Sequence, residues 1–115
     1  MLIPHLHFAG KCAEAITLYE KAFNTKAGDY DYRDGKIAHA EMTVHGQRIF
    51  LNDASFDCGM GHLVLTFETA DELLACYNIL RQDENAPPPF EKTPYSKLSG
   101  NFNDKLGVMW GFILW

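Results

Sequence analysis

The sequence has few cysteines and few cations. Its 115 residues include 3 cysteines, 10 lysines and arginines, and 15 aspartates and glutamates, giving a net charge of −5. An odd cysteine count without a Cys-x-x-Cys pair argues against a disulfide framework and a thiolate zinc site. Reduced thiols are typical of the cytoplasm, so we expect a cytoplasmic protein. The negative charge argues against nucleic acid or an anionic membrane as a partner, since both attract basic patches.

The sequence also lacks several segments that would define other classes of protein. No apolar run approaches the roughly 20 residues that cross a membrane, and the first nine residues lack the basic start of a signal peptide. There is no glycine-rich phosphate loop and no Gly-x-Ser-x-Gly turn. The remaining composition, 47% apolar and 22% charged, is typical of one globular domain over residues 1–115.

A weak internal repeat is the most informative feature of the chain. Segment 5–23 aligns without gaps with segment 62–80, so that His5-Leu6 falls on His62-Leu63. Residue type and order persist along the aligned segments although identity is low. A repeated supersecondary unit indicates two modules, about 1–54 and about 61–115.

Each module has the pattern of a strand, a helix and further strands. Apolar residues at helical spacing predict helices over 12–23 and from Thr69 to about Gln82, the second one opening with a Thr69-to-Glu72 capping box. Strands are expected at 1–9, 37–44, 48–52, 62–68, 90–94, 97–103 and 108–115, with a polar, poor strand at 26–33. This predicts an α+β fold, in which two βαβββ modules form curled mixed sheets around a cleft with the helices outside.

Alternation along the strands separates polar residues from those that pack on the helices. His5 and His7 alternate with Leu6 and Phe8, and His39 and Glu41 share one face of their strand. In the second module His62 and Thr66 occupy the corresponding face. We expect these polar faces to line a ligand cleft.

Four segments resemble the vicinal oxygen chelate superfamily, which includes glyoxalases, bleomycin-resistance proteins and extradiol dioxygenases. They are the opening segment 3–16, segment 35–42, Asn52-Asp53, and the Asp-Lys-x-Gly-Val-x-Trp stretch at 104–110. The resemblance covers nearly the whole chain and is strongest to the PhnB-like subgroup, although the segment between Asn24 and Gly35 is shorter than expected there. It implies a homodimer of paired modules whose cleft holds a divalent metal and a small-molecule ligand.

The resemblance also implies a set of metal ligands. His5 and His62 match the histidines on the first strand of each module. The carboxylate ligands should fall near Phe50 and Gly111, and neither is a carboxylate. Glu41 offers a replacement: with His5 and His62 it would complete a two-histidine, one-carboxylate site for Zn, Ni, Mn, Fe or Mg. His39, close to Glu41, is a candidate general base, and Glu41 is a second candidate for proton transfer.

Three functions are compatible with these residues. The first is a small-molecule-binding protein of the glyoxalase and bleomycin-resistance type that acts as a metal-dependent lyase, isomerase or dioxygenase on vicinal oxygens. The second is a metal-free module that binds or sequesters a small apolar ligand, because Phe50 would turn a ligand position into an apolar wall. In both, His7, Phe50, Val64 and Thr66 line the cleft. The third is a protein whose dimer interface is its function.

Overall fold

The computed structural model describes residues 1–56 and 62–115. They belong to two compact units, Met1–Gly59 and Met60–Trp115. The segment between the two expected modules lies partly outside the described residues. No helix in the described ranges is both long and apolar enough to cross a membrane.

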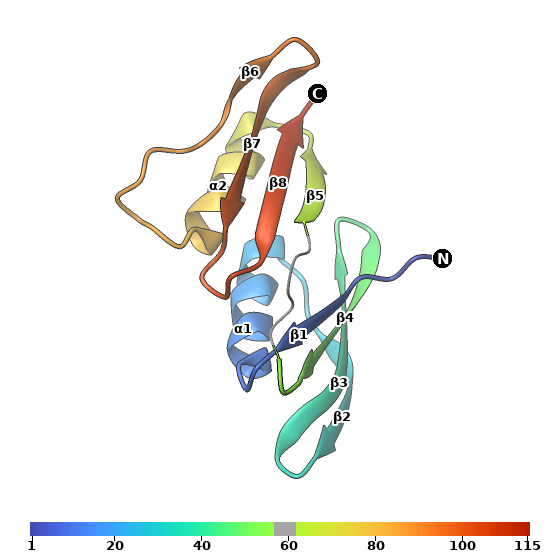
Figure 1. Cartoon of the computed structure of the whole chain (residues 1–115). Helices are drawn as coiled ribbons and strands as arrows, with labels where there is room; N and C mark the ends of the chain where they lie inside the picture. Colours follow the sequence, from blue (N-terminus) through green and yellow to red (C-terminus); the bar gives the residue numbers. More distant parts are fainter. Residues whose placement is uncertain (57–61) are drawn as a thin grey trace. The chain divides into compact units, whose positions relative to one another are not determined.

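The first unit is one βαβββ module (Figure 1). Its elements are β1 (His5–Phe8), α1 (Cys12–Phe23), β2 (Gly28–Arg33), β3 (Lys36–Val44) and β4 (Gln47–Asp53). The strand order is β1-β4-β3-β2, with β1 parallel to β4 and the other neighbours antiparallel. The polar segment expected to be a poor strand therefore forms β2, at the edge of the sheet.

The second unit repeats this arrangement. Its elements are β5 (His62–Phe67), α2 (Ala70–Leu80), β6 (Glu91–Thr93), β7 (Ser96–Asn103) and β8 (Met109–Leu114). The strand order is β5-β8-β7-β6, again with the first and last strands parallel. The predicted α+β class and the two βαβββ modules are confirmed.

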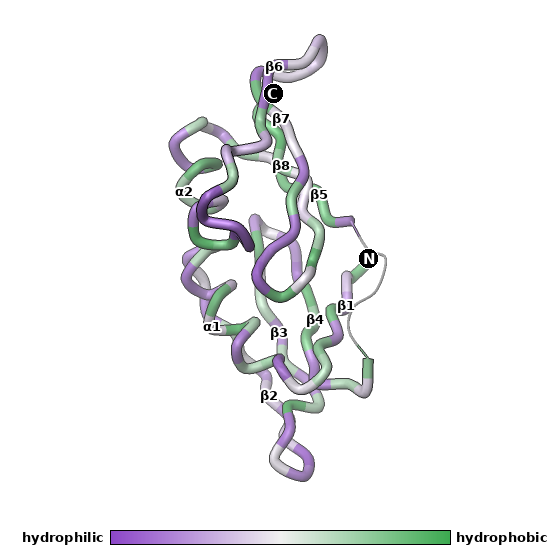
Figure 2. The backbone as a smooth tube through the Cα atoms, turned by 60° about the vertical axis from the view of Figure 1, so that its left-hand side comes forward, coloured by the Kyte–Doolittle hydropathy of each residue, from purple (hydrophilic) through white to green (hydrophobic). Residues whose placement is uncertain are grey.

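One helix covers one face of each sheet. α1 buries Cys12, Ala15, Ile16 and Tyr19, and α2 buries Leu73, Cys76, Tyr77 and Leu80. The strand residues buried with them alternate with more exposed ones, as in Leu6 and Phe8 on β1. Figure 2 shows hydrophobic and hydrophilic residues alternating along both helices. Because strand side chains alternate in direction, the residues between the buried ones point away from the helix.

The Asp53 carboxylate links the start of α1 to the sheet through hydrogen bonds. The Cys12 N–H donates to Oδ1 of Asp53 and the Ile37 N–H donates to Oδ2, each at 3.0 Å. Asp53 thus satisfies a free donor at the helix start and holds the end of β4 next to β3. At the other end Asn24 takes the left-handed conformation, with φ of 50°, which is a common way to end a helix.

α2 begins as predicted and ends earlier. The Thr69 hydroxyl accepts the Glu72 N–H at 3.1 Å. The helix stops at Leu80 rather than near Gln82, because the Arg81 backbone turns extended and pairs with Asp104. The Lys105 N–H then donates to the Leu80 carbonyl at 3.1 Å. A contact with a distant segment thus decides where this helix ends.

Asp104 organises the turn between β7 and β8. Its side chain is fully buried. Oδ1 accepts the backbone N–H groups of Leu106 and Val108 at 2.8 and 3.0 Å, and Oδ2 accepts the Trp110 indole N–H at 2.8 Å. A buried carboxylate needs such donors to offset its loss of water. The closing Asp-Lys-x-Gly-Val-x-Trp motif is therefore a structural one.

Asp104→Ala should lower the free energy of unfolding by about 3 kcal/mol, because three N–H donors lose their acceptor. Urea denaturation measures the loss. Asp83→Ala is the control, since this exposed carboxylate accepts the Asn85 N–H, and its loss should cost about 1 kcal/mol or less. Equal losses in the two variants would contradict the role given to Asp104.

Candidate functional site

The helix-free face of the first sheet carries all five site residues expected in the first module. We call it the open face; it consists of His5, His7, His39, Glu41, Arg48, Phe50 and Asn52. The strand register brings them together, since Phe50 on β4 lies opposite His5 on β1 and Glu41 on β3. The hairpin turn at His45-Gly46, with positive φ at both residues, fixes the β3–β4 register.

Phe50 lies at the centre of the open face. Its ring centroid is 4.8 Å from that of His39 and 5.8 Å from that of His5, both in edge-on arrangements. The Arg48 guanidinium lies 5.5 Å from the same centroid, within the range of a cation–π contact. The Phe50 ring, with two imidazoles and a guanidinium around it, offers a flat apolar surface with polar groups at its edge.

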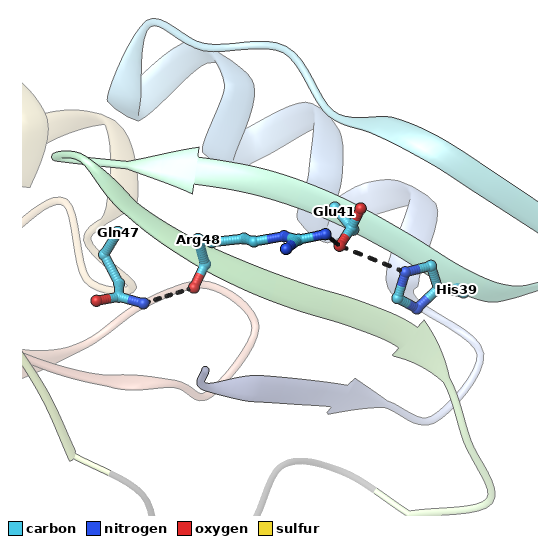
Figure 3. A network of polar contacts seen from close by, with 4 residues as sticks. All are labelled: His39, Glu41, Gln47 and Arg48. Atoms are coloured by element: carbon cyan, nitrogen blue, oxygen red, sulfur yellow. Dashed lines mark hydrogen bonds and ion pairs between the residues drawn. The ribbon is translucent and has the colours of Figure 1, made fainter. Parts of the chain in front are cut away.

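Glu41 is held by a cation on the neighbouring strand (Figure 3). The Arg48 Nη2 group donates to Glu41 Oε1 at 2.5 Å, and His39 Nε2 lies 3.8 Å from the same oxygen. The Glu41 side chain is only 12% exposed. The His39 separation is an ion-pair distance and too long for a hydrogen bond. The expected His39–Glu41 neighbourhood is thus present, with Arg48 as the closer partner of the carboxylate.

His7 has a fixed orientation. Its Nδ1 lies 2.7 Å from Asn52 Oδ1, and because an amide oxygen only accepts hydrogen bonds, Nδ1 is assigned the proton. The His7 ring also lies 4.2 Å from His5 and 4.9 Å from Phe56, between ring centroids. Aromatic and imidazole rings therefore continue from Phe50 to Phe56 along this face.

The surroundings of His5 disfavour its protonation. Burial lowers the pKa of His5 below its ordinary value of 6.5, and the nearby His7 and His39 lower it further. His5 is therefore neutral at pH 7 and can accept or donate a hydrogen bond.

The two described cysteine thiols stay protonated. Burial raises the pKa of Cys12, with a further contribution from Asp53, and burial raises that of Cys76, each to about 12. Such thiols are poor nucleophiles. Cys58 lies outside the described residues.

A groove adjoins the Glu41–Arg48 pair. It has a volume of about 420 Å³, and its lining includes Lys26, Gly28, Asp29 and Thr43 as well as the pair itself. Ligand pockets commonly have volumes of about 300–1,000 Å³. The groove is therefore large enough for a small molecule and is continuous with the open face through Glu41 and Arg48.

On the second sheet, His62 spans a neighbouring strand. His62 on β5 reaches Asn101 on β7, with 2.9 Å between Nε2 and Oδ1, and passes over Gly111 on β8. A Cβ at Gly111 would lie 2.8 Å from both of those atoms. Val64 is 54% exposed and Thr66 is exposed, on the same face as His62. The hydrogen bond therefore depends on the absence of a side chain at Gly111.

The strand register gives the neighbours of the first-strand histidines on β4 and β8. His5 pairs with Phe50, whereas His62 pairs with Met109, and Gly111 corresponds to Asn52. None of these four β4 and β8 residues is a carboxylate. Among residues 1–56 and 62–115, no group of three His, Cys, Asp or Glu side chains is arranged to hold a metal ion.

Four residues at these sites had no predicted role. Arg48, Asn52, Phe56 and Asn101 contact Glu41, His7 and His62. Arg48 and Asn52 alternate with Phe50 along one strand, so the period of two could have placed them on its face. No comparable signal exists for Asn101, because its partner lies on β5, two strands away in the sheet.

The fold and these sites define a chain built from two vicinal-oxygen-chelate modules, and it belongs to the Glyoxalase/Bleomycin resistance protein/Dioxygenase superfamily, whose model matches residues 2–112. Protein YjdN of Escherichia coli is 25% identical, over 95% of this chain and 91% of that protein.

Two solved structures share the fold along nearly the whole chain. A PhnB protein from Bacillus cereus, described as a putative 3-demethylubiquinone-9 3-methyltransferase, has a TM-score of 0.82 and 27% identity, covering 99% of this chain and 98% of its own. Protein PA1353 from Pseudomonas aeruginosa has a TM-score of 0.83 and 21% identity, covering 99% and 96%. The expected likeness to PhnB-like proteins is confirmed.

The pKa of His5 gives a direct test of the open face. By NMR titration His5 should titrate below pH 6.5, and His39→Gln should raise its midpoint because a neighbouring positive charge is removed. His45→Gln, in the hairpin turn, is the control and should leave the midpoint unchanged. A His5 midpoint at or above 6.5 would contradict the geometry.

The lowered pKa of His5 makes the stability of the folded chain depend on pH. The unfolded chain binds a proton at His5 more readily than the folded chain does, so protonation of His5 destabilises the folded state. Above pH 6.5 His5 is neutral in both states, and its full contribution to stability is present. This contribution should be lost as the pH falls from 6.5 towards the folded-state pKa, and His5→Gln should remove that part of the acid sensitivity in urea titrations at several pH values.

Proposed function

We propose that this chain is a small-molecule-binding protein whose open face binds a planar, largely apolar ligand without a metal ion. The observation that carries the proposal is the position of Phe50. It lies opposite His5, where a metal site of this superfamily would need a carboxylate, and it presents an aromatic ring at the centre of the open face.

The donors available for a metal fit one poorly. The Arg48 guanidinium already binds Glu41, and its positive charge opposes a divalent cation at the same oxygen. His62 is bonded to Asn101 over Gly111. The set of His5, His62 and Glu41 as metal ligands therefore remains a prediction.

The polar groups around Phe50 suit a ligand that carries neutral oxygen or nitrogen atoms. His5 is neutral at pH 7 and can act as a donor or an acceptor. Arg48 and Glu41 offset each other's charge. A flat ring can stack or pack edge-on against Phe50 and Phe56, and its substituents can reach the imidazoles. His7 lines this surface, and we propose that Val64 and Thr66 line the corresponding face of the second sheet.

Metal-dependent catalysis is the second candidate function, as a lyase, isomerase or dioxygenase. It is favoured by membership of the superfamily and by the position of His5 and His62 on the helix-free faces of their sheets. In that function Glu41 or His39 would move protons, and release of Glu41 from Arg48 would have to come first.

We further propose that the protein acts in the cytoplasm as a homodimer. The buried, free thiols of Cys12 and Cys76 fit a reducing compartment, and small members of this superfamily are usually dimeric. Light scattering coupled to size exclusion should give the mass of two chains. The mass of one chain at micromolar concentration would contradict the dimer.

Ligand binding can be tested on the protein after treatment with a chelator. We expect small aromatic compounds such as phenol, benzamide and indole to shift the NMR signals of Phe50 and His5. Phe50→Ala should weaken that binding about tenfold, since an aromatic contact surface is lost. Tyr95→Ala is the matched control, because this tyrosine is 67% exposed in the other unit. Binding that requires an added divalent ion, or that survives Phe50→Ala unchanged, would overturn the proposal.

A further inference from the structure

The second sheet carries a separate polar contact point that differs from the first. His62 reaches across β8 to Asn101 on β7 at the one position where β8 has no side chain. An amide oxygen can only accept a hydrogen bond, so the arrangement assigns the proton of a neutral His62 to Nε2. Its Nδ1 then carries a lone pair that Asn101 does not use.

The surroundings of His62 are apolar and exposed. Its register partner Met109 is 40% exposed, and Val64, which also lies on the helix-free face, is 54% exposed. Val64 and Met109 carry no charge, and among the described residues no ion pair involves His62. A single hydrogen-bond acceptor beside two hydrocarbon side chains complements an apolar molecule that carries one hydrogen-bond donor.

We propose that this surface of the second sheet binds the hydroxyl group of a small alcohol or phenol, with His62 Nδ1 accepting the hydroxyl hydrogen. Val64 and Met109 contact the hydrocarbon part. A carboxylate lacks the hydrogen that this acceptor requires and is not the ligand. Gly111 is the determinant, because a Cβ there would push the imidazole away from Asn101. The inference rests on the proposed metal-free, small-molecule-binding function and adds the class of group that the second module recognises.

Phenol and anisole form a matched pair of probes, since they share the ring and differ in the hydroxyl hydrogen. In NMR titrations of the full chain, phenol should shift the signals of His62, Val64 and Met109 and should bind about three- to tenfold more tightly there than anisole. Nitrogen-15 spectra of the free protein at neutral pH should show the proton of His62 on Nε2.

Gly111→Ala should abolish the preference for phenol over anisole, because the new Cβ displaces the ring. Lys92→Ala is the control: this exposed side chain lies on β6, the edge strand of the same sheet farthest from β5, and the preference should persist. If Gly111→Ala fails to fold, Asn101→Ala removes the exposed partner instead and should also reduce the preference.

Three results would overturn the inference: equal binding of the two probes at His62, a proton on Nδ1 of the free protein, or a phenol preference unchanged by the loss of Asn101. Phenol shifts confined to His5, His39 and Phe50 would overturn this inference and leave the proposed function of the open face standing. An absence of shifts on both sheets, with phenol, benzamide and indole alike, would contradict both.

Discussion

The two-residue period of the β-strands is the constraint on which the structure and its site depend. One face of each sheet must be apolar where a helix covers it, so alternate residues of β1 and β4 are committed to the core. Leu6, Phe8, Ile49 and Leu51 meet this requirement in the first sheet. The residues between them are freed from packing, and the chain uses those positions for His5, His7 and Phe50. A slip of one residue in register would bury the imidazoles and expose the core.

The two modules share a topology and differ in the chemistry of their helix-free faces. The first has a phenylalanine among histidines, with Arg48 engaging the nearby carboxylate of Glu41. The second has a glycine over which a histidine and an asparagine meet. In both, the position next to the first-strand histidine lacks the acidic residue that a metal centre would use. Both faces therefore suit organic ligands, within a superfamily whose scaffold serves many functions.

Much of the fold could be predicted because its signals are local. Helical spacing of apolar residues predicts α1 and α2, and the dipeptides Asp34-Gly35 and His45-Gly46 are typical of the tight turns that join β2 to β3 and β3 to β4. The repeat supplied the topology, and the hairpin at His45-Gly46 implies that Glu41 faces Phe50. The end of α2 could not be predicted, because it depends on a pairing between Arg81 and Asp104. The His62–Asn101 hydrogen bond could not be predicted either, because it depends on the order of three strands and on the absence of a side chain at Gly111. In the sequence, Gly111 indicates only that a carboxylate is missing at an expected metal-ligand position.

Metal content tests the central claim, that these faces work without a metal ion, most directly. Elemental analysis by plasma mass spectrometry would be made on native protein purified without chelator, and on the His5→Ala/His62→Ala double variant. We expect far less than one divalent ion per chain in both proteins, before and after incubation with Zn, Ni, Mn, Fe and Mg salts. About one ion per chain in the native protein, lost in the double variant, would contradict this claim and establish His5 and His62 as metal ligands.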